Sequence, residues 1–341
     1  MAAQTVLVTG ASGFIAKHIV RHLLERGYRV RASVRSLARS GEVSAAVTRG
    51  LVEPVAPERL AFVEIDLESD GGWAKALAGT DALIHTASPF PLAQPRNPDD
   101  VIRPAVDGTM RALRAARTAG VRRVVMTSSV VAVTRTALPA GRVRYDERDW
   151  SDVDGAISSY GKSKTLAEKA AWDFAAGEGS GLELTTINPG FVLGPPLDSR
   201  FGTSIGVVKR MLSGKDPAVP RVGYPIVDVR DIAAMHIRAL EIPEAIGKRI
   251  LGASEFLWFA DMAKVLKETF PDRKIATRVA PDLLMRVIGL FDKSVGTILP
   301  ELGEHTEVDN RRAREILGMD FIPARQSVVE AARFLVERGL A

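Results

Sequence analysis

Short runs of apolar and β-branched residues alternate with longer amphipathic stretches through the first half of the chain. The short runs lie at residues 5–9, 29–34, 61–65, 82–85, 123–127 and 183–187, and they predict six strands. The stretches at 14–26, 72–77, 101–119 and 160–175 have apolar residues at helical spacing and predict helices between those strands. This alternation favours an α/β protein with a Rossmann-type doubly wound parallel sheet, covered by helices on both faces.

The pattern changes at about residue 189. Residues 189–224 are rich in Pro and Gly and look irregular, and helical spacing returns at 229–240, 261–269, 311–317 and 327–338. We expect residues 189–341 to form mainly a smaller C-terminal substrate lobe, with a segment at about 225–240 returning to the sheet domain of residues 1–188. Because ligands of open α/β sheets bind beyond the carboxyl ends of the strands, the active site is expected between the two parts.

The composition excludes several classes of protein. With 46% hydrophobic and 26% charged residues over 341 positions, the chain is neither disordered nor fibrous. It has no cysteine, which excludes disulfides and thiolate sites, and no apolar run approaches the roughly 20 residues of a membrane-spanning helix. The N-terminus has the pattern of a core strand instead of a signal peptide, so we expect a soluble, cytoplasmic protein without a membrane partner.

The charge does not favour a nucleic-acid partner either. The net charge is only +5, and the arginines are spread along helices among acidic residues, whereas a nucleic-acid surface gathers its basic residues on one face. Only a small-molecule partner is expected, and the oligomeric state is left open between a monomer and a homodimer.

A glycine-rich turn directly follows the first predicted strand. Gly10 permits the tight turn, Gly13 lets a pyrophosphate approach the helix N-terminus, and the small Ala16 lets helix and strand pack closely. Because a strand precedes this turn and an amphipathic helix follows it, the turn predicts a dinucleotide site. The residues of the turn expected at the cofactor are Gly10, Ser12, Gly13, Phe14 and Ile15.

The end of the second predicted strand indicates which dinucleotide binds. Proteins that prefer NAD place an acidic residue there against the ribose 2′-hydroxyl, but this chain has Arg35. A guanidinium suits the 2′-phosphate, and Arg39 is placed to assist it. Residues 1–188 are therefore predicted to form an NADP(H)-binding domain.

Tyr160 and Lys164 begin a predicted helix at the i, i+4 spacing that puts both on one face. Reduction of a carbonyl needs a proton donor at oxygen, and a tyrosine is a poor acid-base catalyst unless a nearby cation favours its phenolate. Lys164 can supply that cation and reach the cofactor ribose. Ser129 follows the fifth strand at the same edge of the sheet, where it can bind the substrate oxygen.

Seven segments, in a fixed order over nearly the whole chain, carry a resemblance to a known family. They lie at residues 10–16, 85–90, 104–109, 145–150, 160–172, 188–195 and 227–232. Together they resemble the extended short-chain dehydrogenases/reductases of the dihydroflavonol reductase, cinnamoyl-CoA reductase and yeast methylglyoxal reductase group, within the NAD-dependent epimerase/dehydratase superfamily. The resemblance implies an NADP-dependent reductase of aldehydes or ketones with a catalytic triad of Ser129, Tyr160 and Lys164.

The resemblance also implies further cofactor contacts. They are Asp66 and Leu67 at the adenine, Thr86, Ala87 and Ser88 along the cofactor, Pro189, Gly190, Phe191 and Val192 at the nicotinamide, and Ser204 at a phosphate.

The substrate side departs from the flavonoid enzymes. Residues 129–133 lack the Ala-Gly-Thr that follows the catalytic serine in those reductases, so a flavonoid substrate is not expected. Apolar side chains favour a hydrophobic aldehyde or ketone instead, although each could equally belong to the core. The candidate substrate residues are Phe90, Val130, Val131, Phe191 and Tyr224.

Two further motifs and the scaffold itself allow other functions. Residues 202–206 match the Gly-x-Ser-x-Gly elbow of hydrolases but follow a predicted loop instead of the strand that an elbow needs. His18 and His22 have the spacing of a metal pair without a supporting Glu motif, so no metal is expected. On the same scaffold, a nucleotide-sugar epimerase or dehydratase, a 3β-hydroxysteroid-type dehydrogenase and a non-catalytic NADP-sensing regulator remain alternatives.

Overall fold

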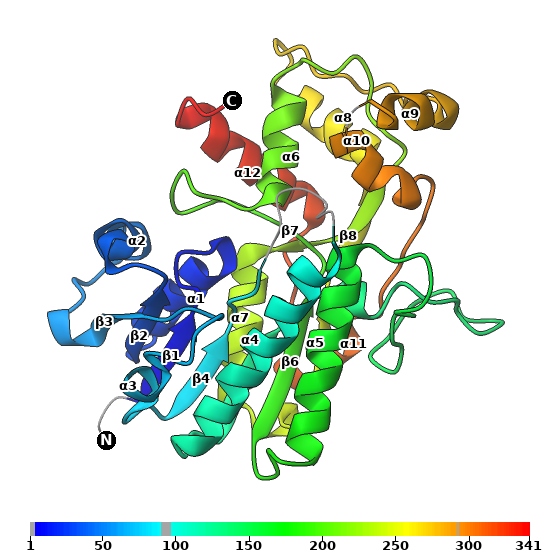
Figure 1. The fold of residues 1–341 in the computed structure, drawn as a ribbon. Helices are drawn as coiled ribbons and strands as arrows, with labels where there is room; N and C mark the ends of the chain where they lie inside the picture. Colours follow the sequence, from blue (N-terminus) through cyan, green and yellow to red (C-terminus); the bar gives the residue numbers. More distant parts are fainter. Residues whose placement is uncertain (1–3, 90–96, 292) are drawn as a thin grey trace.

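A seven-stranded parallel sheet forms the larger part of the molecule (Figure 1). The structure is a computed structural model that describes residues 4–89, 97–291 and 293–341. The strand order is β3-β2-β1-β4-β5-β6-β9, and every neighbouring pair is parallel. The strands are β1 (Thr5–Thr9), β2 (Arg29–Val34), β3 (Leu60–Glu64), β4 (Ala82–His85), β5 (Arg123–Thr127), β6 (Glu183–Pro189) and β9 (Arg249–Gly252). The predicted doubly wound α/β fold is confirmed.

Helices cover both faces of this sheet because its strands are apolar on both sides. Along β1, Val6 and Val8 belong to one core and Leu7 to the opposite one. The first core is closed by α1 (Phe14–Glu25), α2 (Ser40–Thr48), α7 (Val229–Glu241) and α11 (Arg311–Leu317). The second is closed by α3 (Trp73–Leu77), α4 (Asp99–Thr118) and α5 (Ser159–Ala176), of which α4 and α5 run side by side (Figure 1).

A smaller lobe lies beyond one end of the sheet and has its own core (Figure 1). Its sheet has the order β10-β8-β7 and comprises β7 (Phe191–Leu193), β8 (Gly223–Asp228) and β10 (Glu255–Trp258). Its helices are α6 (Thr203–Leu212), α8 (Phe259–Thr269), α9 (Asp282–Gly289), α10 (Lys293–Ile298) and α12 (Ala324–Glu337). Among the described residues, no helix is both long and apolar enough to cross a membrane.

The structure differs from the sequence prediction mainly after residue 189. The stretch expected to be irregular contains β7, α6 and the start of β8, because these elements are short and lie between Pro and Gly residues that hide their periodicity. Of the segment at about 225–240 predicted to return to the sheet domain, the first residues complete β8 in the smaller sheet, and the rest forms α7, which packs along α1. It is followed by β9, a seventh strand that was not predicted. This strand begins with Arg249 and ends with Gly252, so only two apolar residues lie between them and no apolar run stands out.

Candidate active site

The β1–α1 turn forms one wall of a cleft of about 1220 Å³. Gly10 has φ +67°, and a Cβ there would lie 3.0 Å from the Cα of Ala87, so only glycine allows this close approach to the chain after β4. Gly13 is the N-cap of α1. Because glycine has no side chain that could cap the helix, the backbone amides at this helix end are available to an anion.

Two arginines from the segment after β2 line the same wall. Arg35 is exposed, whereas Arg39 is half-buried and its Nη1 donates to Ser12 Oγ at 3.4 Å. The Arg39 Nε is buried and has no hydrogen-bond partner among the residues that the structure describes. Within the described part of the chain, the acidic residues that line the cleft are Asp216 and Glu301, and both belong to the smaller lobe. The wall therefore offers guanidinium donors where an NAD-type site offers a carboxylate.

Most of the other residues predicted at the cofactor line the cleft, but Asp66 does not. Leu67, the residues Thr86, Ala87 and Ser88, and the residues Pro189, Gly190, Phe191 and Val192 all line the cleft. Asp66 is exposed, does not line the cleft, and accepts a bond from the Glu68 amide at 3.0 Å. Ser204 lines the cleft, but its hydroxyl donates to the Val192 carbonyl at 2.5 Å.

Ser129, Tyr160 and Lys164 lie together on the floor of the cleft. Ser129 is the N-cap of a short 3₁₀ turn at Val130–Ala132, directly after β5, and the other two lie on the first turns of α5. The hydroxyls of Ser129 and Tyr160 are hydrogen-bonded to each other. Lys164 Nζ lies 6.0 Å from the centre of the Tyr160 ring.

Burial controls the protonation of both α5 groups. It raises the pKa of Tyr160 to about 12, against an opposing effect of the Ser129 hydrogen bond. It lowers the pKa of Lys164 to about 8, while the negative charge of Glu168 opposes this change. At neutral pH the tyrosine therefore holds its proton, and the lysine is mostly an ammonium ion.

A buried histidine lies behind this floor at the end of β4. The Thr9 hydroxyl oxygen accepts bonds from the amides of Thr86 and Ala87, at 3.1 and 3.2 Å, and lies 2.9 Å from His85 Nδ1. Burial lowers the pKa of His85 to about 3, so the ring is neutral at physiological pH. His85 begins the segment 85–90 that carries the family resemblance, but no role was predicted for it from the sequence.

The substrate side of the cleft is largely apolar. Val130, Val131 and Tyr224 line it, and the rings of Phe191 and Tyr224 are stacked with their centres 4.9 Å apart. Phe90 lies outside the described residues.

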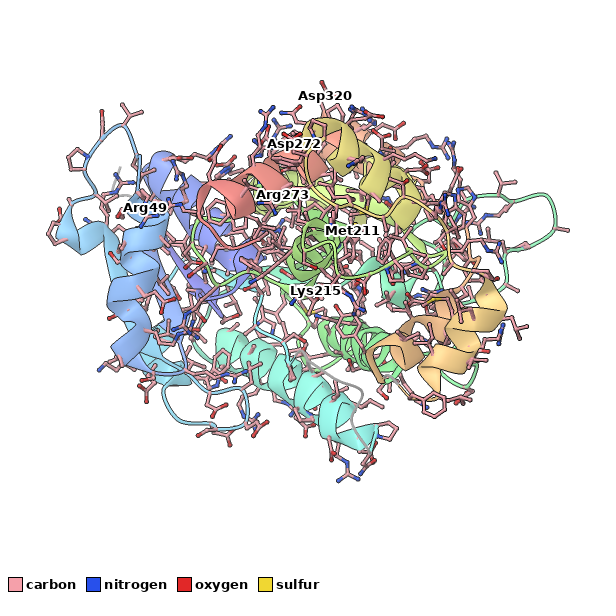
Figure 2. All side chains as sticks on the ribbon, turned by 90° about the horizontal axis from the view of Figure 1, so that it is seen from above. Arg49, Met211, Lys215, Asp272, Arg273 and Asp320 are labelled. Carbon is pink, nitrogen blue, oxygen red and sulfur yellow. The ribbon has the colours of Figure 1, made fainter. Side chains whose placement is uncertain are left out.

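The smaller lobe adds lining residues that sequence reasoning missed. Met211 on α6 lies near the middle of the molecule when it is viewed from above (Figure 2). Large apolar side chains of this lobe also line the cleft, among them Phe259, Leu284, Met285, Ile288, Val295 and Ile298. Two acidic residues of the lobe also line the cleft: Asp216, which is paired with Arg210, and Glu301, which accepts a hydrogen bond from the Tyr224 hydroxyl. No short motif marks these positions, because they meet the cleft only through the packing of the lobe.

The structure also places the two alternative sites, the hydrolase elbow at Ser204 and the metal pair at His18 and His22. Residues 194–202 form a loop before α6, so Ser204 does not stand on the strand-to-helix turn of a hydrolase elbow. His18 Nε2 lies 3.1 Å from the Pro195 carbonyl oxygen, and burial lowers the pKa of His18 to about 3. Within the described ranges, no three His, Cys, Asp or Glu side chains gather in a way that could hold a metal ion.

The fold and the cleft define a class of protein, a dinucleotide-binding α/β protein with a Ser, Tyr and Lys centre beside the cofactor turn. The chain belongs to the NAD dependent epimerase/dehydratase family, because the model of that family matches its residues 6–251.

Individual relatives are similar over most of the chain. Cinnamoyl-CoA reductase 1 of Petunia hybrida is 33% identical over an alignment of 342 positions that covers 99% of this chain and 94% of that protein. Dihydroflavonol 4-reductase of Zea mays is 34% identical over 80% of this chain and 76% of its own length. The crystal structure of yeast methylglyoxal/isovaleraldehyde reductase complexed with NADPH is 28% identical, with a TM-score of 0.81 over 99% of this chain and 100% of that one.

Proposed function

We propose that this protein is an NADPH-dependent reductase that transfers a hydride to the carbonyl of a hydrophobic aldehyde or ketone. The observation that carries the proposal is the meeting of three groups in one cleft: the glycine turn, the arginines after β2, and Ser129 with Tyr160 and Lys164. The relatives support it, since they include two reductases by name and a further reductase crystallised with NADPH.

The cleft fits the cofactor at both of its charged ends. The open N-terminus of α1 suits a pyrophosphate, and Gly10 lets the turn before this helix pack closely against Ala87. The Arg39 Nε, which makes no hydrogen bond to the described residues, suits an oxygen of the 2′-phosphate, and Arg35 lines the same cleft. NADPH, when bound, supplies the hydride.

The residues of the chain then manage the oxygen of the carbonyl. Ser129 and Tyr160, whose hydroxyls are in contact, both donate hydrogen bonds to this oxygen, and Tyr160 gives it the proton as negative charge develops. The Lys164 ammonium stabilises the tyrosinate that is left and orients the cofactor ribose. Because Lys164 is buried and Tyr160 is largely buried, water screens this electrostatic stabilisation less than it would at the surface.

The apolar wall favours a hydrophobic substituent beside the carbonyl. Each methylene that moves from water into the cleft contributes about 0.8 kcal/mol at most, which is about fourfold in kcat/KM. Polar sugars would gain little from Val130, Val131 and the side chains of the smaller lobe.

NADPH oxidation measured against a panel of substrates tests the proposal. The panel contains aldehydes, α-diketones, ketoesters, cinnamoyl-CoA, a dihydroflavonol and nucleotide sugars, together with a homologous series of linear aldehydes. We expect kcat/KM to rise along the series until the cleft is full. Co-purified NAD with activity on a nucleotide sugar, and none on the carbonyl compounds, would overturn the proposal.

A further inference from the structure

A buried carboxylate lies one helical turn beyond Lys164 on α5. The side chain of Glu168 has no exposed surface. Its Oε2 accepts hydrogen bonds from Ser128 Oγ at 2.6 Å and from Asn188 Nδ2 at 2.7 Å. Its Oε1 accepts one from Thr186 Oγ1 at 2.9 Å. Donors from β6 and from the turn after β5 therefore converge on one residue of the catalytic helix.

Two of these donors lead directly to the candidate catalytic serine. Ser128 is its neighbour in the chain, and Asn188 Nδ2 also donates to the carbonyl oxygen of Ser129 at 3.1 Å. The Glu168 carboxylate thus fixes the turn that carries Ser129 against the helix that carries Tyr160 and Lys164. A shift of that turn would separate the two hydroxyls that face the substrate oxygen.

The charge of Glu168 is matched by a buried arginine. Arg249 Nε on β9 lies 2.7 Å from Glu168 Oε1, and the guanidinium stacks on the Trp150 ring at 3.6 Å. Two buried ions lose their hydration, and replacing such a pair with apolar residues is often neutral or stabilising. Stability alone therefore gives little reason for a charge at this place.

Lys164 gives a functional reason for the charge. Among the described residues, two groups interact electrostatically with the Lys164 ammonium. Glu168 on the same helix raises the pKa of Lys164, and the charge of Lys164 in turn lowers the pKa of His85 at the end of β4. His85 is neutral, and no charged side chain of α4, which packs along α5, is coupled to Lys164 within the described ranges. Glu168 is thus the negative charge that opposes the desolvation of Lys164.

We propose that Glu168 is a positioning residue for the reduction, which fixes the Ser129 turn through Ser128 and Asn188 and holds Lys164 as an ammonium ion. The inference rests on the proposed function, because it assigns to Glu168 the support of the groups that this reaction uses. It adds a residue that touches neither substrate nor cofactor.

The Glu168→Gln variant tests the role of the charge, since it keeps the size and removes the negative charge. We expect kcat to fall at least tenfold at pH 7, and the alkaline limb of the kcat/KM profile to move down by about one pH unit or more. A merely structural role would lower activity or melting temperature without moving that limb. Glu168→Asp keeps the charge, so it should lower kcat and leave the limb in place.

Glu147→Gln is the matched control. Glu147 is another buried glutamate close to Arg249, which donates to its carbonyl oxygen, and its carboxylate lies 3.7 Å from Arg312 Nε. It is not coupled to Lys164. This variant should change the melting temperature and leave the pH profile unchanged.

The pH dependence of NADPH binding separates failure of this inference from failure of the proposed function. If no carbonyl compound is reduced, the affinity of the wild type for NADPH should still weaken as Lys164 loses its proton, and Glu168→Gln should move that midpoint down. A folded Glu168→Gln protein with wild-type pH profiles for both rate and binding would overturn the inference.

If Glu168→Gln does not fold, Asn188→Ala and Glu168→Asp decide the matter. Asn188→Ala breaks the link to Ser129 without a change of charge, so it should lower kcat at every pH and keep the limb. Full activity in Asn188→Ala, or a shifted limb in Glu168→Asp, would overturn the inference.

Discussion

Removal of Arg39 should weaken the binding of NADPH far more than that of NADH. The Arg39 guanidinium lines the cleft beside the N-terminus of α1, holds Ser12 Oγ through Nη1, and has a buried Nε without a hydrogen-bond partner among the described residues. A 2′-phosphate would satisfy this group, whereas the 2′-hydroxyl of NADH lacks the charge that a guanidinium pairs with.

The structure sets the size of the effect. A hydrogen bond to a charged group contributes about 1.5–3 kcal/mol when it is well shielded from water. The Arg39 side chain is 35% exposed, and Glu42 Oε2 lies 4.0 Å from its Nε and competes for it. Solvent screening and this competition lower the contribution to just below this range, about 1.4 kcal/mol or tenfold in Kd. Arg35 is exposed and should contribute no more than Arg39.

Fluorescence titration of Arg35→Ala, Arg39→Ala and the double variant with both cofactors measures these contributions at one fixed ionic strength. We expect the wild type to prefer NADPH at least tenfold, each variant to lose part of this preference, and the double variant to lose most of it. Arg49→Ala is the control, because it removes the same charge directly after α2, away from the centre of the molecule (Figure 2) and outside the cleft. Equal affinities in the wild type, or full preference in the double variant, would refute the reasoning.

Three further changes have defined outcomes. Tyr160→Phe should lower kcat at least about a hundredfold with NADPH binding nearly intact, since it removes the proton donor and keeps the ring; a residual rate above about a tenth of the wild type would assign the acid elsewhere. Lys164→Ala should weaken both turnover and NADPH binding in the same assays, and unchanged binding would contradict its contact with the ribose. Burial raises the pKa of Asp231 to about 6, so the stability linked to its proton is present below about pH 4 and is lost as the pH rises through 6. Asp231→Asn keeps an acceptor for the Ile322 amide and should raise the free energy of unfolding at pH 7 by about 1–2 kcal/mol, measured by urea denaturation; an unchanged pH dependence between about 4 and 6 would count against this.

Local chemistry explains why the sheet domain could be predicted from the sequence. The six strands read as β-branched runs because both faces of the sheet are covered, and burial on both sides demands apolar residues at successive positions. The ends of the helices were also predicted closely, as with 101–119 against the observed α4 at Asp99–Thr118. The smaller lobe was not predicted at the same level, since its strands have three to six residues and its loops are rich in Pro and Gly.

The same division holds at the cleft. The sequence by itself determined the glycine turn, the arginines after β2 and the pair Tyr160 and Lys164, because each depends on residues close together in the chain, on a φ value, a strand end or a helical spacing. Only the tertiary structure decided which distant groups surround them: the apolar side chains of α9 and α10, the neutral His85, and the Glu168 cluster with Arg249. Glu168 and Arg249 are 81 positions apart, and no local pattern marks either as the partner of the other. Their pairing exists because β6 and β9 are neighbours in the sheet and α5 packs against β6, which places a carboxylate and a guanidinium together where water is excluded.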